Sequence, residues 1–212
     1  ILKKLVADGK IGNRIAMVNV ADAFGIELAN AARPVFKAAG LEIVYDKSYP
    51  LGTQDLSPVV KGAKAANPDA FIAWSYPPDT FGLTAQAKII GLNVKAFYTA
   101  VATAFPVYAG KFGGAIEGVL GAGGINPDAA QMMAYRKAHK EITGKDADFW
   151  ASAVVYASLQ ILEQSIEAVG SKDRGAVTAF IKANSFNTVI GSVKFNNQNN
   201  DKFWTVGQWQ NG

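Results

Sequence analysis

The sequence of 212 residues contains no cysteine and only one histidine, His139. The lack of cysteine excludes disulfide frameworks, thiolate nucleophiles, cysteine zinc sites and iron–sulfur clusters. The lack of a second histidine excludes multi-histidine metal sites and leaves a Ser-His-Asp triad one candidate base. Because His139 lies in a basic helical stretch at 135–140, we interpret it as a solvated surface residue.

The sequence also has only a small excess of positive charge and no long apolar run. Lysine and arginine exceed aspartate and glutamate by 21 − 17 = +4, which is too small an excess to predict nucleic-acid binding. The two longest uncharged stretches, 96–110 and 149–162, fall short of the ~18 apolar residues of a membrane span. We therefore expect neither a nucleic-acid partner nor direct membrane insertion.

What is present is a globular composition, with 50% hydrophobic and 11% aromatic residues. A chain of this size can bury a core without disulfide or metal staples. It begins at Ile1 without an initiator methionine or a signal-peptide n-region, so we interpret it as a processed or truncated product.

Strand and helix patterns alternate over the first two thirds of the chain. Short apolar runs predict strands at 13–20, 41–46, 70–75, 94–99 and 116–120. Helical spacing predicts helices at 24–39, 56–66, 79–90 and 103–112. This alternation is typical of parallel βαβ units, so the expected fold class is α/β with a Rossmann-like parallel sheet and flanking helices.

The pattern changes after the glycine-rich residues 121–124. Three helices are predicted at 126–143, 149–169 and 174–184, with no strands between them to cover. The last segment predicts a β-hairpin of 189–195 with 203–209 across an asparagine-rich turn.

Motifs of nucleotide-dependent and hydrolytic enzymes are missing from the sequence. It contains no Gly-x-Gly-x-x-Gly after a strand, no phosphate-binding Gly-x-x-x-x-Gly-Lys-Ser/Thr and no Gly-x-Ser-x-Gly elbow. We therefore expect a protein that is not an enzyme and that holds no cofactor or metal.

The candidate binding residues follow the predicted strands, because ligands of open parallel sheets bind beyond the carboxyl ends of the strands. The aromatic candidates, which would form apolar or stacking walls, are Phe24, Tyr76 and Phe105. The neutral hydrogen-bonding candidates are Ser75, Thr99 and Thr103. Such a surface would suit a small, partly apolar or aromatic anion. The alternative is that Phe24 and Phe105 only seal the edge of the sheet.

Four stretches in order carry a family resemblance: NVADAFG at 19–25, NPDAFIA at 67–73, GSKD at 170–173 and FNTVIGSVKF at 186–195. Together they resemble type I periplasmic solute-binding proteins of ABC importers, in particular the branched-chain amino-acid (leucine/isoleucine/valine) receptor group. The resemblance implies two Rossmann-like lobes that trap a small carboxylate between them and deliver it to an inner-membrane permease. It also implies a periplasmic location.

The resemblance covers essentially the whole chain and implies a division into lobes. Residues 12–123 and 188–212 match the second lobe, whereas 1–11 and 124–187 match a partial, mainly helical remnant of the first. The chain would then be a C-terminal fragment, whose bare helix at 149–169 is covered by another copy or by a retained N-terminal piece. The hinge candidates are 121–124 and 187–188.

The resemblance also assigns residues to the ligand. Phe24 and Tyr76 stand where the family has aromatic contacts, and Val101 stands where amino-acid receptors have an acid that pairs with the ammonium. Because a buried ammonium without a counter-charge is costly, an aromatic carboxylate is favoured unless Asp79 reaches the ligand. The alternative functions are a cytoplasmic sensor or repressor core and, less favoured, a nucleotide-dependent α/β reductase.

Overall fold

The computed structural model describes residues 1–123, 125–200 and 205–211, and their contacts form two compact units. Unit 1 comprises Ile1–Thr103, Tyr108–Ala122 and Gly207–Gly212. Unit 2 comprises Ala104–Val107 and Gly123–Val206. Each unit is described by itself below.

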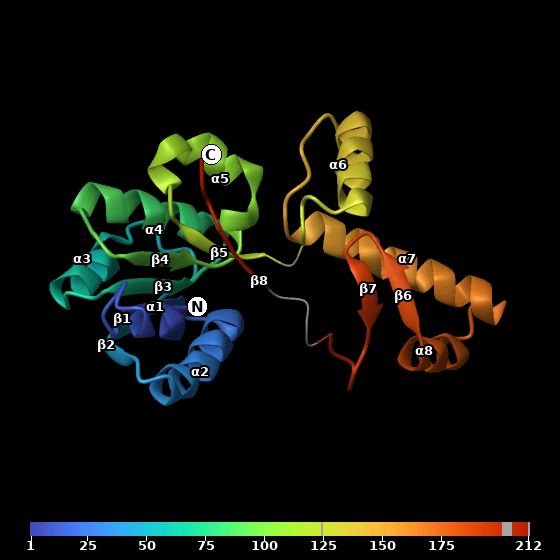
Figure 1. Ribbon diagram of the computed structural model, residues 1–212, viewed down its shortest axis with the longest axis horizontal. Helices are drawn as coiled ribbons and strands as arrows, with labels where there is room; N and C mark the ends of the chain where they lie inside the picture. Colours follow the sequence, from blue (N-terminus) through green and yellow to red (C-terminus); the bar gives the residue numbers. More distant parts are fainter. Residues whose placement is uncertain (124, 201–204, 212) are drawn as a thin grey trace. The chain divides into compact units, whose positions relative to one another are not determined.

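A six-stranded sheet forms the centre of unit 1, with the strand order β2-β1-β3-β4-β5-β8 (Figure 1). Its strands are β1 (Arg14–Val20), β2 (Glu42–Tyr49), β3 (Ala70–Trp74), β4 (Ala96–Thr99), β5 (Leu120–Gly123) and β8 (Thr205–Gln208). The first five pair in parallel. The accompanying helices are α1 (Leu2–Ala7), α2 (Ala23–Ala38), α3 (Ser57–Ala65), α4 (Pro77–Ile90) and α5 (Pro106–Phe112). The predicted parallel α/β sheet is confirmed.

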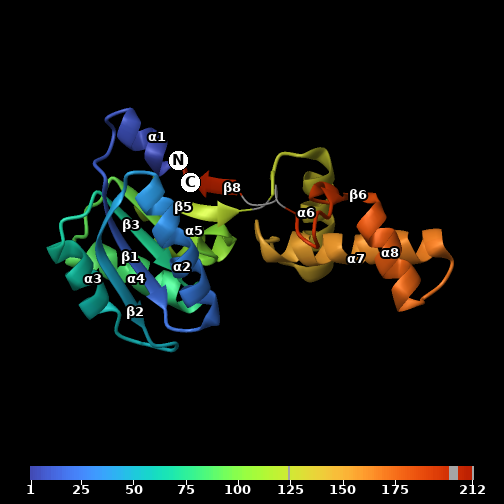
Figure 2. The ribbon, with the colours of Figure 1, turned by 90° about the horizontal axis from the view of Figure 1, so that it is seen from below.

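Successive side chains of β1 point to opposite faces of the sheet, and each face has its own core. Ala16 and Val18 pack in one cluster with Leu83 of α4, on the side that α3 and α4 cover. Ile15 and Met17 pack in a second cluster with residues of α2. Figures 1 and 2 show α2 on one face of the sheet and α3 and α4 on the other. Because both faces are covered, the edge at the carboxyl ends of the strands remains as the place for a ligand.

The strand predicted at 116–120 is displaced toward the C-terminus. Residues Gly113–Ile116 form a 3-10 turn, and β5 begins only at Leu120. Gly113 and Gly118 both have positive φ angles, which break extended structure in this segment. The side chain of Ile116 packs with Tyr108 instead of joining the sheet.

The predicted hairpin of 189–195 with 203–209 is wrong. The hairpin that forms pairs β6 (Ser185–Thr188) with β7 (Gly191–Lys194), and Gly191 closes its turn with φ at +100°. β8 joins the larger sheet beside β5 (Figure 2). Trp209 decides this placement, because its backbone N–H donates to Val119 O at 3.0 Å and its indole Nε1–H to Thr103 O at 2.9 Å. Residues 203 and 204 of the prediction lie outside the described residues.

Unit 2 contains α6 (Ala130–Thr143), α7 (Ala151–Val169) and α8 (Arg174–Ala183) together with the β6–β7 hairpin (Figure 1). The hairpin is bound to α7 by Gln160 Oε1, which accepts from Val189 N–H at 2.8 Å, and by Gln164 Nε2, which donates to Asn187 O at 3.0 Å. The three helices predicted for this region are therefore present, and a two-stranded sheet packs on them.

The two contact units divide the chain at other residues than the expected lobes, whose boundaries stay a prediction. Residues 1–11 fall in unit 1, because Leu2 and Val6 of α1 pack on the core of the six-stranded sheet. The end of β6 and all of β7 fall in unit 2, because these two strands pair with each other, and unit 2 also includes the first two residues of β8. Of the hinge candidates, 121–123 belong to β5 and 187–188 to β6, while residue 124 lies outside the described residues.

The long helix α7 buries one stripe and exposes another. Ala153, Ala157 and Ile161 are buried, whereas Val155 and Leu159 are 61% and 59% exposed. What covers this exposed stripe stays a prediction. None of the helices among the described residues is long and apolar enough to cross a membrane.

Candidate functional site

Two aromatic rings stack at the carboxyl edge of the sheet in unit 1. Phe24 lies in the first turn of α2, directly after β1, and Tyr76 is the residue that precedes α4, directly after β3. Their ring centroids are 4.8 Å apart with an interplanar angle of 24°. Both rings are half-buried against the core of the unit. The structure thus brings together two of the three predicted aromatic residues, because β1 and β3 are neighbours in the sheet.

Gly25 sets the position of Phe24. An added Cβ at Gly25 would overlap the carbonyl oxygen of Val20 and would lie 2.7 Å from Val20 Cγ1. Only glycine therefore lets the first turn of α2 lie this close to the end of β1. The ring of Phe24 is carried on that turn.

Asp22 is a residue of this surface that the sequence reasoning missed. Its Oδ1 accepts from Gly25 N–H at 3.0 Å, so it caps α2. Its Oδ2 accepts from Tyr76 Oη–H at 2.8 Å, which raises the pKa of Tyr76. An aspartate just before a predicted helix is a signal for the cap. No local signal indicates the bond to Tyr76, which is 54 residues away.

Asp79, the acid named as one that would have to reach the ligand for an amino acid to bind, is buried in the first turn of α4. It is 5% exposed, and its Oδ2 accepts from Tyr49 Oη–H at 3.4 Å. Burial raises the pKa of the Asp79 carboxyl, and the nearby charge of Asp22 raises it further. Hydrogen bonds from the Tyr76 backbone and from Tyr49 oppose that rise. Asp79 therefore serves the packing of α4 against β2 rather than an open surface.

The raised pKa of Asp79 predicts a pH-dependent effect of Asp79→Asn. An acid whose pKa is higher in the folded protein than in the unfolded chain contributes stability at low pH and loses it as the pH rises through the folded value. The free energy of unfolding of the variant, relative to the parent, should therefore increase from about pH 4 to about pH 7. Urea denaturation across this range measures the difference. A difference that falls or stays constant would contradict the assignment.

The remaining predicted hydroxyl residues of unit 1, Ser75, Thr99 and Thr103, are buried. The hydroxyls of Ser75 and Thr103 form hydrogen bonds within the protein, whereas Thr99 Oγ1 has no hydrogen-bond partner among the described residues. Ser75 Oγ and Thr80 Oγ1 are 2.7 Å apart, and Thr80 Oγ1 donates to Ala100 O at 2.8 Å. Thr103 Oγ1 donates to Thr99 O at 3.0 Å. These groups hold the loops after β3 and β4 in place, and their role as ligand contacts stays a prediction.

Val101 has a backbone conformation that is rare for its side chain. Its φ is +59°, in the left-handed region that a β-branched residue occupies only under strain. The side chain is 8% exposed and apolar, so this position adds no charge to the surface.

Phe105, the third predicted aromatic residue, belongs to unit 2. Its ring packs against that of Trp150, with centroids 6.4 Å apart. The adjacent Ala104 O accepts from Phe149 N–H at 2.8 Å, which ties this short segment to the start of α7. The structure therefore does not assign Phe105 to the same unit as Phe24 and Tyr76.

Two hollows lie elsewhere. One of about 280 Å³ in unit 1 is lined by residues near the amino end of β4, including Lys88, Asn93 and Glu117. One of about 290 Å³ in unit 2 lies between α7 and the hairpin, with Ile161 and Val193 in its wall. Neither includes a predicted site residue.

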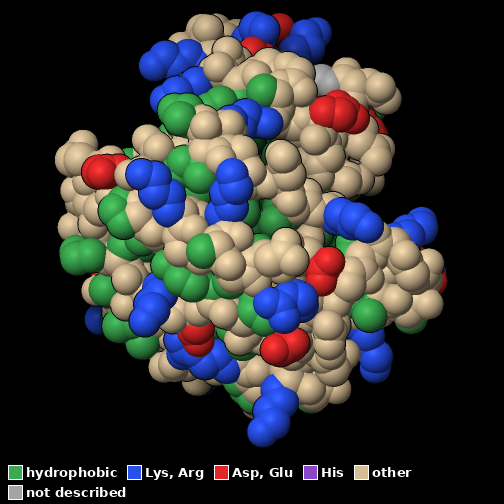
Figure 3. Space-filling view, turned by 90° about the vertical axis from the view of Figure 1, so that its left-hand side faces the viewer, with side chains coloured by type: hydrophobic (Ala, Val, Ile, Leu, Met, Phe, Trp, Pro, Cys, Tyr) green, Lys and Arg blue, Asp and Glu red, His purple; other side chains and the backbone are tan. Residues whose placement is uncertain are grey.

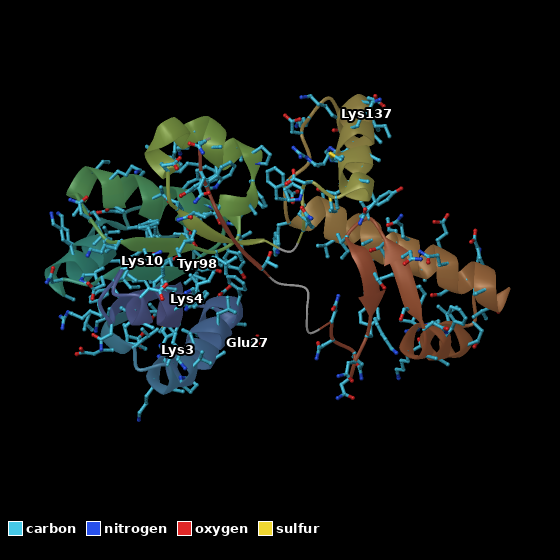
Figure 4. The ribbon with its side chains drawn as sticks, viewed as in Figure 1. Lys3, Lys4, Lys10, Glu27, Tyr98 and Lys137 are labelled. Atoms are coloured by element: carbon cyan, nitrogen blue, oxygen red, sulfur yellow. The ribbon has the colours of Figure 1, made fainter. Side chains whose placement is uncertain are left out.

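Basic side chains are dispersed on the face of unit 1 that Figure 3 shows, where lysines and arginines lie among hydrophobic and acidic side chains. Lys3, Lys4 and Lys10, labelled in Figure 4, come from α1 and the turn after it. Among the described residues there is no group of three or more histidine, aspartate or glutamate side chains that could hold a metal.

Comparisons with known proteins identify the family and the relatives that this chain resembles. The family model described as "Periplasmic binding protein" matches residues 1–212. The Leu/Ile/Val-binding protein of Citrobacter freundii is 27% identical over 196 residues, which cover 92% of this chain and 52% of the relative. The chain thus spans about half the length of the curated relatives it matches.

Two solved structures share the fold at low sequence identity. A leucine-, isoleucine-, valine-, threonine- and alanine-binding protein from Brucella ovis matches with a TM-score of 0.82 at 23% identity, covering 98% of this chain and 55% of that one. A solute-binding protein of an ABC transporter from R. palustris, in complex with benzoate, matches with a TM-score of 0.86 at 18% identity, covering 99% and 58%. With a family match over its whole length and this fold, the chain belongs to the periplasmic binding protein family.

Proposed function

We propose that this chain is part of an extracytoplasmic solute receptor that binds a small carboxylate and delivers it, chemically unchanged, to the membrane permease of an ABC importer. The observation that carries the proposal is the stacked pair Phe24–Tyr76, half-exposed at the edge of the sheet where ligands of such sheets bind. Family membership supports the receptor role.

An aromatic carboxylate is the first candidate for the ligand. A stacked ring pair offers a flat apolar wall, and aromatic groups prefer offset stacking or edge contacts with such rings. Val101 carries no charge, and Asp79 is turned inward to Tyr49. Among proteins of this fold, one is described in complex with benzoate.

An amino acid is the second candidate, and Asp22 is the observation that favours it. Its half-buried carboxylate lies beside the ring pair, where it could pair with the ammonium group of a ligand. The relative from Citrobacter freundii is named for leucine, isoleucine and valine.

A thermal-shift screen of the complete protein tests the proposal, with amino acids, benzoates, phenylpropanoids and nucleotides as candidate ligands. A ligand at a hundred times its Kd adds about 2.7 kcal/mol to the free energy of unfolding. For a chain of 150–250 residues that corresponds to a rise in Tm of about 5–10 °C, and the rise is smaller for a longer chain. We expect such a rise with benzoates or phenylpropanoids. A rise with nucleotides alone would support the reductase alternative and overturn the receptor.

A further inference from the structure

We propose that Asp22 determines the ligand specificity of the surface formed by the stacked rings of Phe24 and Tyr76, the ring-pair surface. Asp22 would reject ligands that carry a second carboxylate at the end that lies on this surface, opposite their first carboxylate. This inference rests on the proposed function, because it concerns the same surface and the same class of ligand. The basis of the inference is the set of hydrogen-bond donors and charges that the described residues of unit 1 offer at the edge of the sheet.

The two helix starts at this surface are poor sites for an anion. Helix α4 begins with Pro77 and Pro78, which have no N–H to donate. At the start of α2, Gly25 N–H is already taken by the carboxylate of Asp22, whose negative charge occupies the place where an anion would bind. The usual attraction of a carboxylate to helix starts is therefore weak here.

The polar groups of the ring pair itself are acceptors. The phenolic proton of Tyr76 is donated to Asp22 Oδ2, so Tyr76 Oη is left with lone pairs for a ligand. The carboxylate of Asp22 can only accept while it is ionised. A ligand end that lies here must be apolar or must bring its own donor, such as a hydroxyl or an ammonium.

The charge near the ring pair is negative, because it comes from the carboxylates of Asp22 and Asp79. Among the described residues, none of the ion pairs within 4.0 Å involves Asp22 or Asp79. The negative charges of Asp22 and Asp79 both raise the pKa of Tyr76, and both raise the pKa of Tyr49. The two carboxylates therefore act on the same region. A second carboxylate on the ligand would meet like charge without a compensating donor, and such contacts are strongly unfavourable.

The experiment compares ligands of equal size that differ in charge. Isothermal calorimetry on the complete protein would use benzoate, monomethyl terephthalate and terephthalate. We expect the dianion to bind about 100-fold more weakly than its size-matched monoanion.

The variant Asp22→Asn should remove most of this discrimination. Asparagine is as good a helix cap as aspartate, and its side-chain N–H can donate to Tyr76 Oη, so the surface keeps its shape and loses its charge. We expect the ratio of the two affinities to fall to about tenfold or less. The control is Asp8→Asn, which removes one negative charge at the end of α1, where Asp8 pairs with Lys4. That variant should leave the ratio unchanged.

The results separate the inference from the function it rests on. Equal binding of the two size-matched ligands by the parent protein, or a ratio that Asp22→Asn leaves unchanged, would overturn the role of Asp22 and leave the receptor standing. Failure of both monoanions, benzoate and monomethyl terephthalate, to bind would instead overturn the proposed aromatic carboxylate ligand, and the role of Asp22 with it.

Discussion

Replacing Gly25 with alanine is expected to lower the free energy of unfolding by about 3 kcal/mol or more. The added methyl group would overlap the backbone carbonyl of Val20, and neither β1 nor α2 can move without disturbing the core on both faces of the sheet. Urea denaturation followed by circular dichroism measures the loss.

Gly110 provides a matched control for this substitution. It lies within α5, and apart from its chain neighbours and the backbone of its own helix, no heavy atom lies within 4 Å of the Cβ that alanine would add. Gly110→Ala should therefore raise stability by about 0.5–1 kcal/mol, because alanine is the better helix former. If Gly25→Ala were as well tolerated as Gly110→Ala, the close approach of α2 to β1 would be refuted.

Replacing Phe24 with alanine is expected to weaken binding of the ligand found in the thermal-shift screen by about 30-fold or more. The substitution removes one ring of the stacked pair, and a well-packed aromatic contact is commonly worth about 2 kcal/mol or more at a binding surface. Calorimetry with the ligand measures the change in Kd.

The control is Phe36→Ala in the same helix. Phe36 is also half-buried, and it lies twelve residues, or about 18 Å of helix, from Phe24. Both substitutions should lower Tm, because both remove packing against the core. Only Phe24→Ala should change Kd, and an equal Kd for the two variants would remove Phe24 from the ligand surface.

Much of unit 1 could be predicted because its elements are strongly periodic. The strands β1, β3 and β4 and the helices α2, α3 and α4 lie where apolar spacing placed them, within a few residues. The prediction was wrong for 116–120, where glycines with positive φ break an apolar run. It was also wrong for the last hairpin, because alternating patterns show that a segment is extended but do not show which partner it pairs with.

The candidate site was predictable to a similar degree. Phe24 and Tyr76 could be found because each follows a predicted parallel strand, and such strands bring their carboxyl ends to one edge. Asp22 could be found as a helix cap, whereas its bond to Tyr76 depends on β1 and β3 being neighbours. Ser75 and Thr103 lie where they were expected, and the structure alone shows that their hydroxyls are used internally.

The sequence by itself determined the class of fold, the parallel arrangement of the strands and the edge at which aromatic residues collect. Each of these depends on local spacing, since burial repeats every two residues in a strand and about every 3.6 in a helix. Only the tertiary structure decided that Phe105 packs in unit 2, that Trp209 brings β8 to β5, and that Asp22 holds Tyr76. Those outcomes depend on which distant segments compete best for the same hydrogen bonds and the same apolar surface. The local spacing of residues does not reveal the result of that competition, because it describes each segment without its partners.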